Sequence, residues 1–329
     1  MIIDVHTHIV PEQFPDYLGT HQEQRWPSMC ACETAGHKAV TIAGKTFREV
    51  TTSSWDAALR LADMDSEGVA KQALSPMPEL LSYWFSADDG LTMSRYTNET
   101  IAGMVAVDPD RFFGLGMVPL QDPELAAKEM ASLKKEYGLQ GIEVGSNVNG
   151  TPIGDPKFEP IFAAAVEHDL AIFVHALHPA GMDRLVGPPI MAALVAFPNE
   201  NAFAVASVIS GGLLDKYPDV RIGFSHCGGS FGLVLPRMMH GWRGLGDKLL
   251  PKSPLEYARA LYYDTLVYDL PTLNHLRELF GDSQLMVGSD YPFVIRERSP
   301  GHWLDDLNLS DEQRHQLSHG NAERFLGVG

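Results

Sequence analysis

The sequence predicts an α/β fold: a (β/α)8 TIM barrel with a small insertion after the first strand. Eight short apolar segments alternate along the chain with segments of helical periodicity. The apolar segments have the length of strands and are almost continuously hydrophobic, as buried parallel strands are. Because 329 residues is the length of one such barrel, we expect a single domain over residues 1–329.

The strands and helices follow one another in regular order. Strands are expected at residues 1–8, 70–74, 112–118, 141–144, 171–174, 221–224, 262–266 and 284–287. Helices are expected from residue 53, over 88–107, from 122 to 138, from 155, and over 190–217, 271–280 and 311–325.

Local signals mark where several helices begin. Ser53-x-x-Asp56 resembles a capping box, which predicts a helix that begins at Ser53. Asp122 and Asp155 are each followed by proline, the pattern of an N-cap with proline at the first helical position.

Residues 11–52 show little helical periodicity and are rich in proline, glycine, histidine and cysteine. A loop this long inside a compact domain is usually functional, so we interpret residues 11–52 as a small insertion within the barrel. Within it we expect a hairpin of residues 39–42 against 45–50, turning at Ala43-Gly44.

Composition limits the classes of partner. A net charge of −17 argues against nucleic acid and acidic membrane surfaces, and an anionic substrate needs a local basic pocket. The three cysteines have no disulfide-framework spacing, which suits a reducing cytosol. We see no signal-peptide pattern and no run of about 18 apolar residues, so we expect a soluble cytoplasmic protein without membrane contact.

Histidines and one aspartate stand where predicted strands end. His6 and His8 are two apart on the first strand and therefore share a face, although exposed histidines near a terminus often have this spacing too. His175, His226 and Asp290 follow strands five, six and eight. Because the carboxyl ends of barrel strands meet at one mouth, these side chains predict a metal site.

Three histidines and one carboxylate leave an open position for water, as catalytic zinc sites do, with iron, nickel or copper as alternatives. We assign His226 as the acid/base beside the metal, because His175 and Asp290 complete the ligand set begun by His6 and His8. The alternative exchanges the roles of His175 and His226.

Several stretches carry a resemblance to a known family. They are D-V-H-T-H at 4–8, K-T-F-R at 45–48, V-H at 174–175, F-S-H-C-G-G-S-F at 224–231, G-S-D-Y-P-F at 288–293 and G-N-A at 320–322. Together they resemble the amidohydrolase superfamily, and within it the aminocarboxymuconate-semialdehyde decarboxylase family. The resemblance covers nearly the whole chain.

The resemblance implies a metal-dependent, non-oxidative decarboxylase of an unsaturated or aromatic carboxylate, with zinc as the metal and manganese or another divalent ion as the alternative. It implies no organic cofactor. By this resemblance His6, His8, His175 and Asp290 are metal ligands, and His226 and Asp290 are catalytic.

The resemblance also implies three substrate residues. Arg48 matches an arginine that binds the substrate carboxylate, and Phe293 is expected to stack against a planar substrate. Arg237 matches an arginine that reaches the neighbouring subunit's site, which implies a homodimer. Two arginines suit a dicarboxylate, because each guanidinium binds a carboxylate with two hydrogen bonds; without the family, a surface salt bridge is the alternative for either.

Two features depart from the family pattern. Glu143 stands where relatives carry a neutral amide; it either points inward to bind a second metal or polarise substrate, or is a salt-bridged barrel residue, which we favour. The loop after His175 lacks tryptophans typical of the muconate enzymes, which leaves the identity of the substrate open.

Two other functions remain open. The same centre suits a hydrolase or hydratase acting on a lactone, a carbon–carbon bond or an unsaturated dicarboxylate, and release of CO2 against uptake of water separates these from a decarboxylase. A non-enzymatic metal-storing or ligand-binding barrel requires a closed metal site, and the open coordination argues against it.

Overall fold

The computed structural model describes residues 1–19 and 25–329. Eight parallel strands form one sheet in the order β1-β5-β6-β7-β10-β11-β12-β13. Their bounds are Ile3–Ile9, Lys71–Pro76, Phe112–Gly116, Gly141–Gly145, Ala171–His175, Ile222–Phe224, Tyr262–Asp264 and Leu285–Met286. The eight strands expected from the sequence are confirmed.

The sheet closes on itself where the last strand meets the first. The backbone N–H of Val5 donates to the carbonyl of Val287 at 2.9 Å, and that of Asp290 donates to the carbonyl of His6 at 2.8 Å. Thr7 and Tyr291 form a parallel bridge beside them. The predicted (β/α)8 barrel is therefore confirmed, and its closing seam joins the segments that carry His6, His8 and Asp290.

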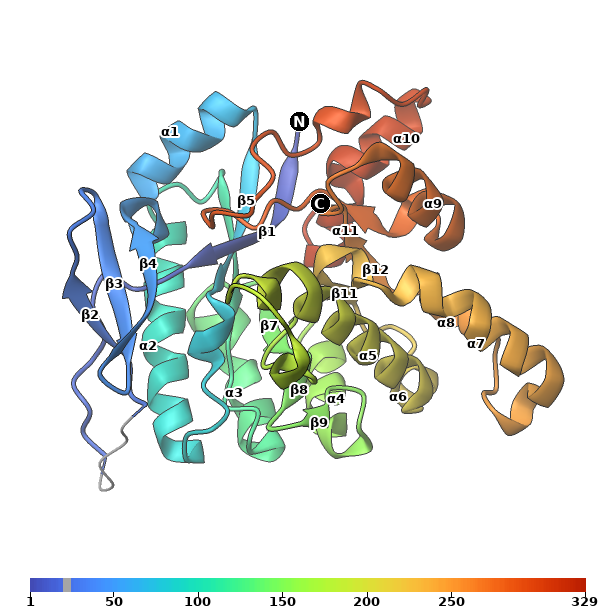
Figure 1. Cartoon of the computed structure of the whole chain (residues 1–329), viewed down its shortest axis with the longest axis horizontal. Coiled ribbons are helices and arrows are strands. Elements are labelled where there is room, and N and C mark those ends of the chain that lie inside the picture. The colour runs from blue at the N-terminus through green and yellow to red at the C-terminus, as the bar shows by residue number, and fades with distance from the viewer. Residues whose placement is uncertain (20–24) are drawn as a thin grey trace.

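Helices surround the barrel (Figure 1). They are α1 Ala57–Glu67, α2 Ala87–Val105, α3 Pro123–Glu136, α4 Glu159–Glu167, α5 Phe197–Ser210, α6 Leu213–Lys216, α7 Phe231–Leu245, α8 Pro254–Ala258, α9 Leu270–Phe280, α10 Asp311–His315 and α11 Asn321–Leu326. The inside of the barrel is filled by apolar side chains of the strands, and Phe325 of α11 packs beneath them against Phe173 and Tyr262.

Predicted helices differ from those observed in several places, and the one expected over 311–325 is divided by a π-helical turn into α10 and α11. The helix expected from Ser53 begins instead at Ala57, because the Asp56 carboxylate accepts the N–H groups of Ala58 and Leu59 and so caps α1. The helix expected over 190–217 is broken at Gly211, whose backbone lies so close to the loop after β7 that a Cβ there would meet a carbonyl oxygen at 1.9 Å. The break separates α5 from α6.

Residues of the insertion form a three-stranded antiparallel sheet of β2 Ser28–Ala31, β3 His37–Ile42 and β4 Lys45–Thr51. The expected hairpin is confirmed as β3 and β4, while the exposed strand β2 was not predicted. The sheet lies outside the barrel beside α2 (Figure 1). A small apolar cluster fixes it there, with Val40 and Val50 packed against Val10, Met77 and Leu80.

One helical stretch, Ala192–Ser210, is long and apolar enough to cross a membrane, with a mean hydropathy of 1.4. The expectation that the chain holds no such run was therefore wrong by length and composition. However, Glu200 and Asn201 on this stretch are buried and bond to loops at the barrel mouth, so one of its faces belongs to the protein core.

Candidate metal centre

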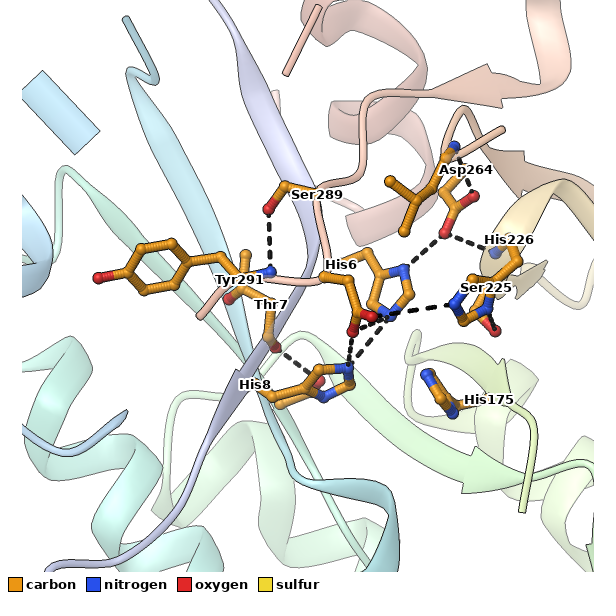
Figure 2. A network of polar contacts seen from close by, with 12 residues as sticks. His6, Thr7, His8, His175, Ser225, His226, Asp264, Ser289 and Tyr291 are labelled. Atoms are coloured by element: carbon orange, nitrogen blue, oxygen red, sulfur yellow. Dashed lines mark hydrogen bonds and ion pairs between the residues drawn. The ribbon is translucent and has the colours of Figure 1, made fainter. Parts of the chain in front are cut away.

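Four predicted ligands lie together at the barrel mouth. The ligand atoms of His6, His8, His175 and Asp290 all fall within 4.8 Å of one another. Strand β1 supplies the first two side chains, β10 ends at His175, and Asp290 follows β13 with a left-handed backbone φ of 66°. Figure 2 shows the imidazole rings of His6, His8 and His175 gathered around one point.

The hydrogen bonds behind the three rings turn their Nε2 atoms inward. Nδ1 of His8 lies 3.1 Å from the Pro76 carbonyl, and Nδ1 of His175 lies 2.9 Å from the Ala176 carbonyl. Because a carbonyl oxygen only accepts, both Nδ1 atoms carry the proton and both Nε2 atoms present a lone pair. Ring nitrogens oriented in this way by outer partners are typical of metal ligands.

The spacing of these atoms fits a bound cation. Nε2 of His6 lies 3.1 Å from Nε2 of His8, and Oδ1 of Asp290 lies 3.0 Å from the same His8 atom. Nε2 of His175 is buried without a hydrogen-bond partner among the described residues. Lone pairs that face one another this closely repel unless a positive charge lies between them, so the donor set fits a divalent metal.

The pKa values of the metal-free side chains also indicate that this group favours a bound positive charge. Burial disfavours the charged form of His6, but the hydrogen bond to Asp264 and the charge of Asp290 outweigh it and raise the pKa of His6 to about 9. Burial lowers the pKa of His8 to about 4. Burial alone would raise the pKa of Asp290, yet the facing imidazoles of His8 and His6 lower it overall.

Asp264 organises the centre, and the sequence interpretation missed it. Its buried carboxylate lies 2.6 Å from Nδ1 of His6 and accepts the backbone N–H groups of His226 and Cys227, each at 2.8 Å, and of Leu266 at 3.0 Å. In Figure 2 it lies between His6 and His226. The available signal was a lone acid inside the segment predicted as strand seven, residues 262–266; the observed strand β12 ends at this residue.

His226 lies beside the ligand group and not within it. The turn Ser225–Gly228 holds it at a left-handed φ of 51°, and its Nε2 is 4.0 Å from Oδ2 of Asp290. The side-chain amide nitrogen of Asn201 lies 3.3 Å from its Nδ1. The Ser225 hydroxyl lies 3.0 Å from the same Nδ1 and can donate or accept, while Nε2 faces Asp290. Burial lowers the pKa of His226, so the ring is neutral.

Two of the three predicted substrate residues are near this group. Arg48 on β4 places its guanidinium carbon 4.3 Å from the ring centre of Phe293, and burial lowers its pKa against the charges of Asp290 and Glu79. Phe293 stacks on His8, with ring centres 4.9 Å apart. Arg237 is exposed on α7, and no contact within the described residues joins it to the centre.

Glu143 points into the barrel beneath His8. It is fully buried, accepts a short hydrogen bond from the Ser75 hydroxyl, and lies 3.7 Å from Nδ1 of His8. Because His8 is neutral, this pair is not a salt bridge, and no lysine or arginine of the described chain pairs with Glu143. The interpretation as a salt-bridged residue was wrong; burial raises the pKa of Glu143 to about 8.

Arg60 supports the ligand strand from behind and was also missed. Its side chain is fully buried and donates to the carbonyl of His8 at 2.6 Å, to the Thr7 hydroxyl at 3.1 Å and to the carbonyl of Ser53 at 3.1 Å. Its guanidinium also lies over the ring of Tyr291, the residue after Asp290. Arg60 therefore joins both sides of the barrel seam.

Comparison with known proteins places this site in a family. Residues 3–328 match the amidohydrolase family. The chain is 35% identical over 334 residues to 2-amino-3-carboxymuconate-6-semialdehyde decarboxylase of Dictyostelium discoideum, covering 99% of this chain and 91% of that protein. It is 26% identical over 255 residues to 2-keto-4-carboxy-3-hexenedioate hydratase of Sphingobium sp., covering 70% of each.

Among solved structures, the chain is similar to 5-carboxyvanillate decarboxylase of Novosphingobium aromaticivorans in complex with manganese and 4-hydroxy-3-methoxy-5-nitrobenzoic acid. The TM-score is 0.74 at 25% identity, and the match covers 84% of this chain and 82% of that one. The matched family, the near full-length relative and the His/Asp centre at the barrel mouth agree: this chain belongs to the amidohydrolase family.

Proposed function

We propose that this protein is a metal-dependent, non-oxidative decarboxylase of an unsaturated or aromatic carboxylic acid. The observation that carries the proposal is the His/Asp centre with the neutral imidazole of His226 beside it and the half-buried cation Arg48 at the same mouth. The Dictyostelium relative is a decarboxylase, and its match to this chain covers nearly the whole length of both proteins, which supports the same chemistry.

The residues divide the reaction between them. Arg48 binds the substrate carboxylate and holds it against the flat side of Phe293. A divalent metal held by His6, His8, His175 and Asp290 would supply Lewis acidity toward the acid group. As the bond from carbon to the carboxylate breaks, CO2 leaves, and Nε2–H of His226 gives its proton to the carbon that keeps the electron pair.

We propose zinc as the metal, because three imidazoles and one carboxylate with an open position suit it. Manganese, present in the carboxyvanillate decarboxylase complex, is the alternative. Metal analysis of the purified protein, followed by reconstitution of the chelated protein with each ion, distinguishes them by restored turnover.

We further propose a homodimer in which Arg237 completes the partner's site. Supporting this, α7 exposes apolar side chains beside Arg237: Leu233 is 77% exposed and Val234 39%. Phe203 on α5, which packs against α7, is 62% exposed. An exposed apolar face of this kind is typical of subunit interfaces. Mixing inactive His226→Ala and Arg237→Ala chains should restore activity, since one site of a mixed dimer has both residues.

The central experiment is CO2 release by metal-loaded protein from a panel of carboxymuconate semialdehydes and hydroxybenzoates. We expect CO2 release from one of these two substrate classes, and we expect a chelator that removes the metal to abolish it. His226→Ala should keep its metal and lose most activity, whereas His275→Ala, on the exposed face of α9, should change neither. Full activity of His226→Ala would refute its role.

A second candidate is hydration of a related unsaturated acid, favoured by the Sphingobium hydratase relative. Water uptake without CO2 release from the same panel would select it. We also propose a cytoplasmic location, since Cys30, Cys32 and Cys227 are free thiols; recovery of the protein in the cytosolic fraction tests this.

A further inference from the structure

Three metal-ligating side chains lie together on the last helical segment, far from the barrel mouth. The ligand atoms of His315, His319 and Glu323 fall within 4.8 Å of one another. Their segment contacts the start of the barrel: α11 packs on β1 and β13, and the carbonyl of Phe325 accepts from Arg221, which precedes β11. The cluster is therefore at the opposite end from the strand ends that carry the metal centre.

The winding of the helix brings the three residues onto one face. A π-helical turn, Gln316–Gly320, separates α10 from α11. A π turn accommodates one extra residue, so the step of eight positions from His315 to Glu323 winds like a step of about seven, nearly two full turns of a helix with about 3.6 residues per turn. In an unbroken α-helix the same three positions would drift around the axis.

Local contacts leave the ligand atoms available. The rings of His315 and His319 meet edge to face with centres 4.2 Å apart. Nε2 of His315 lies 3.0 Å from the place where a Cβ would stand on Gly320, so the missing side chain makes room for this ring. Nδ1 of His319 contacts the Ser318 hydroxyl at 2.8 Å, and the ring also interacts with the backbone of Met1, which a metal at Nε2 would have to displace if that nitrogen makes the contact.

The third ligand is also unengaged. Neither Glu323 nor His315 has a side-chain hydrogen-bond or ion-pair partner within residues 1–19 and 25–329. Two imidazoles and one carboxylate form a ligand set that zinc uses in proteins, with water filling the remaining position.

We propose that His315, His319 and Glu323 form a second divalent-metal site, for zinc or a similar borderline ion, that ties α10 to α11. A metal bound there links α10 to α11, which carries Phe325, the side chain that packs beneath the barrel strands. The proposal does not depend on the decarboxylase assignment, since the two sites share no residue.

The test is zinc stoichiometry of the full chain after chelation and dialysis, measured by calorimetric titration. Wild type should bind about two zinc ions per chain, and His319→Ala and Glu323→Gln about one. His275→Ala, a matched exposed helical histidine without a neighbouring ligand set, should bind about two. Both cluster variants should keep the turnover of the barrel-mouth centre.

Thermal unfolding provides a second readout. The second zinc equivalent should raise the unfolding midpoint of wild type and leave that of Glu323→Gln unchanged. Glu323→Gln is a conservative change at a partly exposed position, so it tests the site even if His319→Ala folds poorly. Binding of only one zinc by wild type, or of two by Glu323→Gln, would overturn the proposal.

Discussion

Replacing Asp264 by asparagine removes one or two of four hydrogen bonds, depending on which way the amide turns. One carboxylate oxygen serves His6 and the N–H of His226, and the other serves the N–H groups of Cys227 and Leu266. An amide nitrogen toward Cys227 and Leu266 leaves two backbone donors without a partner, whereas toward His6 it leaves the N–H of His226 without one, because the His6 ring can change tautomer and accept. Each buried donor left without a partner costs about 1–3 kcal/mol, so we expect a loss of about 1–6 kcal/mol in the free energy of unfolding.

The orientation of the amide also affects how the metal is bound. If its nitrogen faces His6, the ring must accept at Nδ1, and its proton moves to Nε2, the atom that binds the metal. If its oxygen faces His6, the ligand keeps its tautomer but loses the charge of Asp264. Loss of such an outer partner typically lowers metal affinity about 10–100-fold, which we take as the expected range.

Competition titration against a chelator gives the affinity, and chemical denaturation gives the stability. Asp306→Asn, at an exposed carboxylate, is the control and should leave both within error. An Asp264→Asn protein with wild-type metal affinity and wild-type stability would refute the inference that this carboxylate holds the ligand and the turn.

Three further outcomes follow from the structure. Arg60→Met should cost about 3–5 kcal/mol, because buried carbonyls of the ligand strand lose a charged donor, while Arg95→Met at a surface ion pair should cost under about 1 kcal/mol in the same denaturant titration. In metal-free protein Glu143 keeps its proton up to about pH 8, whereas the unfolded chain loses it near pH 4.5. The free energy of unfolding therefore falls as pH rises between these values. Glu143→Gln cannot lose a proton, so at pH 7 it should lack about 3 kcal/mol of this decrease. Because the metal must displace a proton from His6, with its pKa of about 9, calorimetry in buffers of different ionisation enthalpy should detect proton release, and apparent affinity should fall about tenfold per pH unit below 9. If wild type and Glu143→Gln show the same pH dependence of the free energy of unfolding, the argument about Glu143 is contradicted. If metal binds without proton release, the argument about His6 is contradicted.

The ligands were predictable because each follows a recognisable strand. His6 and His8 share a face by strand periodicity, and His175 and Asp290 follow segments whose apolar character already marks them as barrel strands. The resemblance to a family then separated the role of His226 from that of His175, and His226 lies outside the group whose ligand atoms fall within 4.8 Å of one another.

The supporting residues were not predictable, because their roles depend on contacts between segments distant in sequence. Asp264 acts through His6, 258 residues away, and Arg60 is fully buried although arginine is ordinarily a surface residue. The start of α1 was misplaced because Ser53 and Asp56 both carry capping side chains, and only packing decides which of them caps.

The position of β4 has a consequence for how such enzymes diversify. All four candidate ligands stand on the barrel, whereas Arg48 comes from a hairpin that packs outside it through a small apolar cluster of its own. Under the proposed function, the reacting centre and the substrate-binding arginine therefore belong to separate segments of the chain. Exchange of the hairpin between relatives, with the apolar contacts at Val10 and Leu80 retained, offers a modular route to new substrates that leaves the reacting centre unaltered.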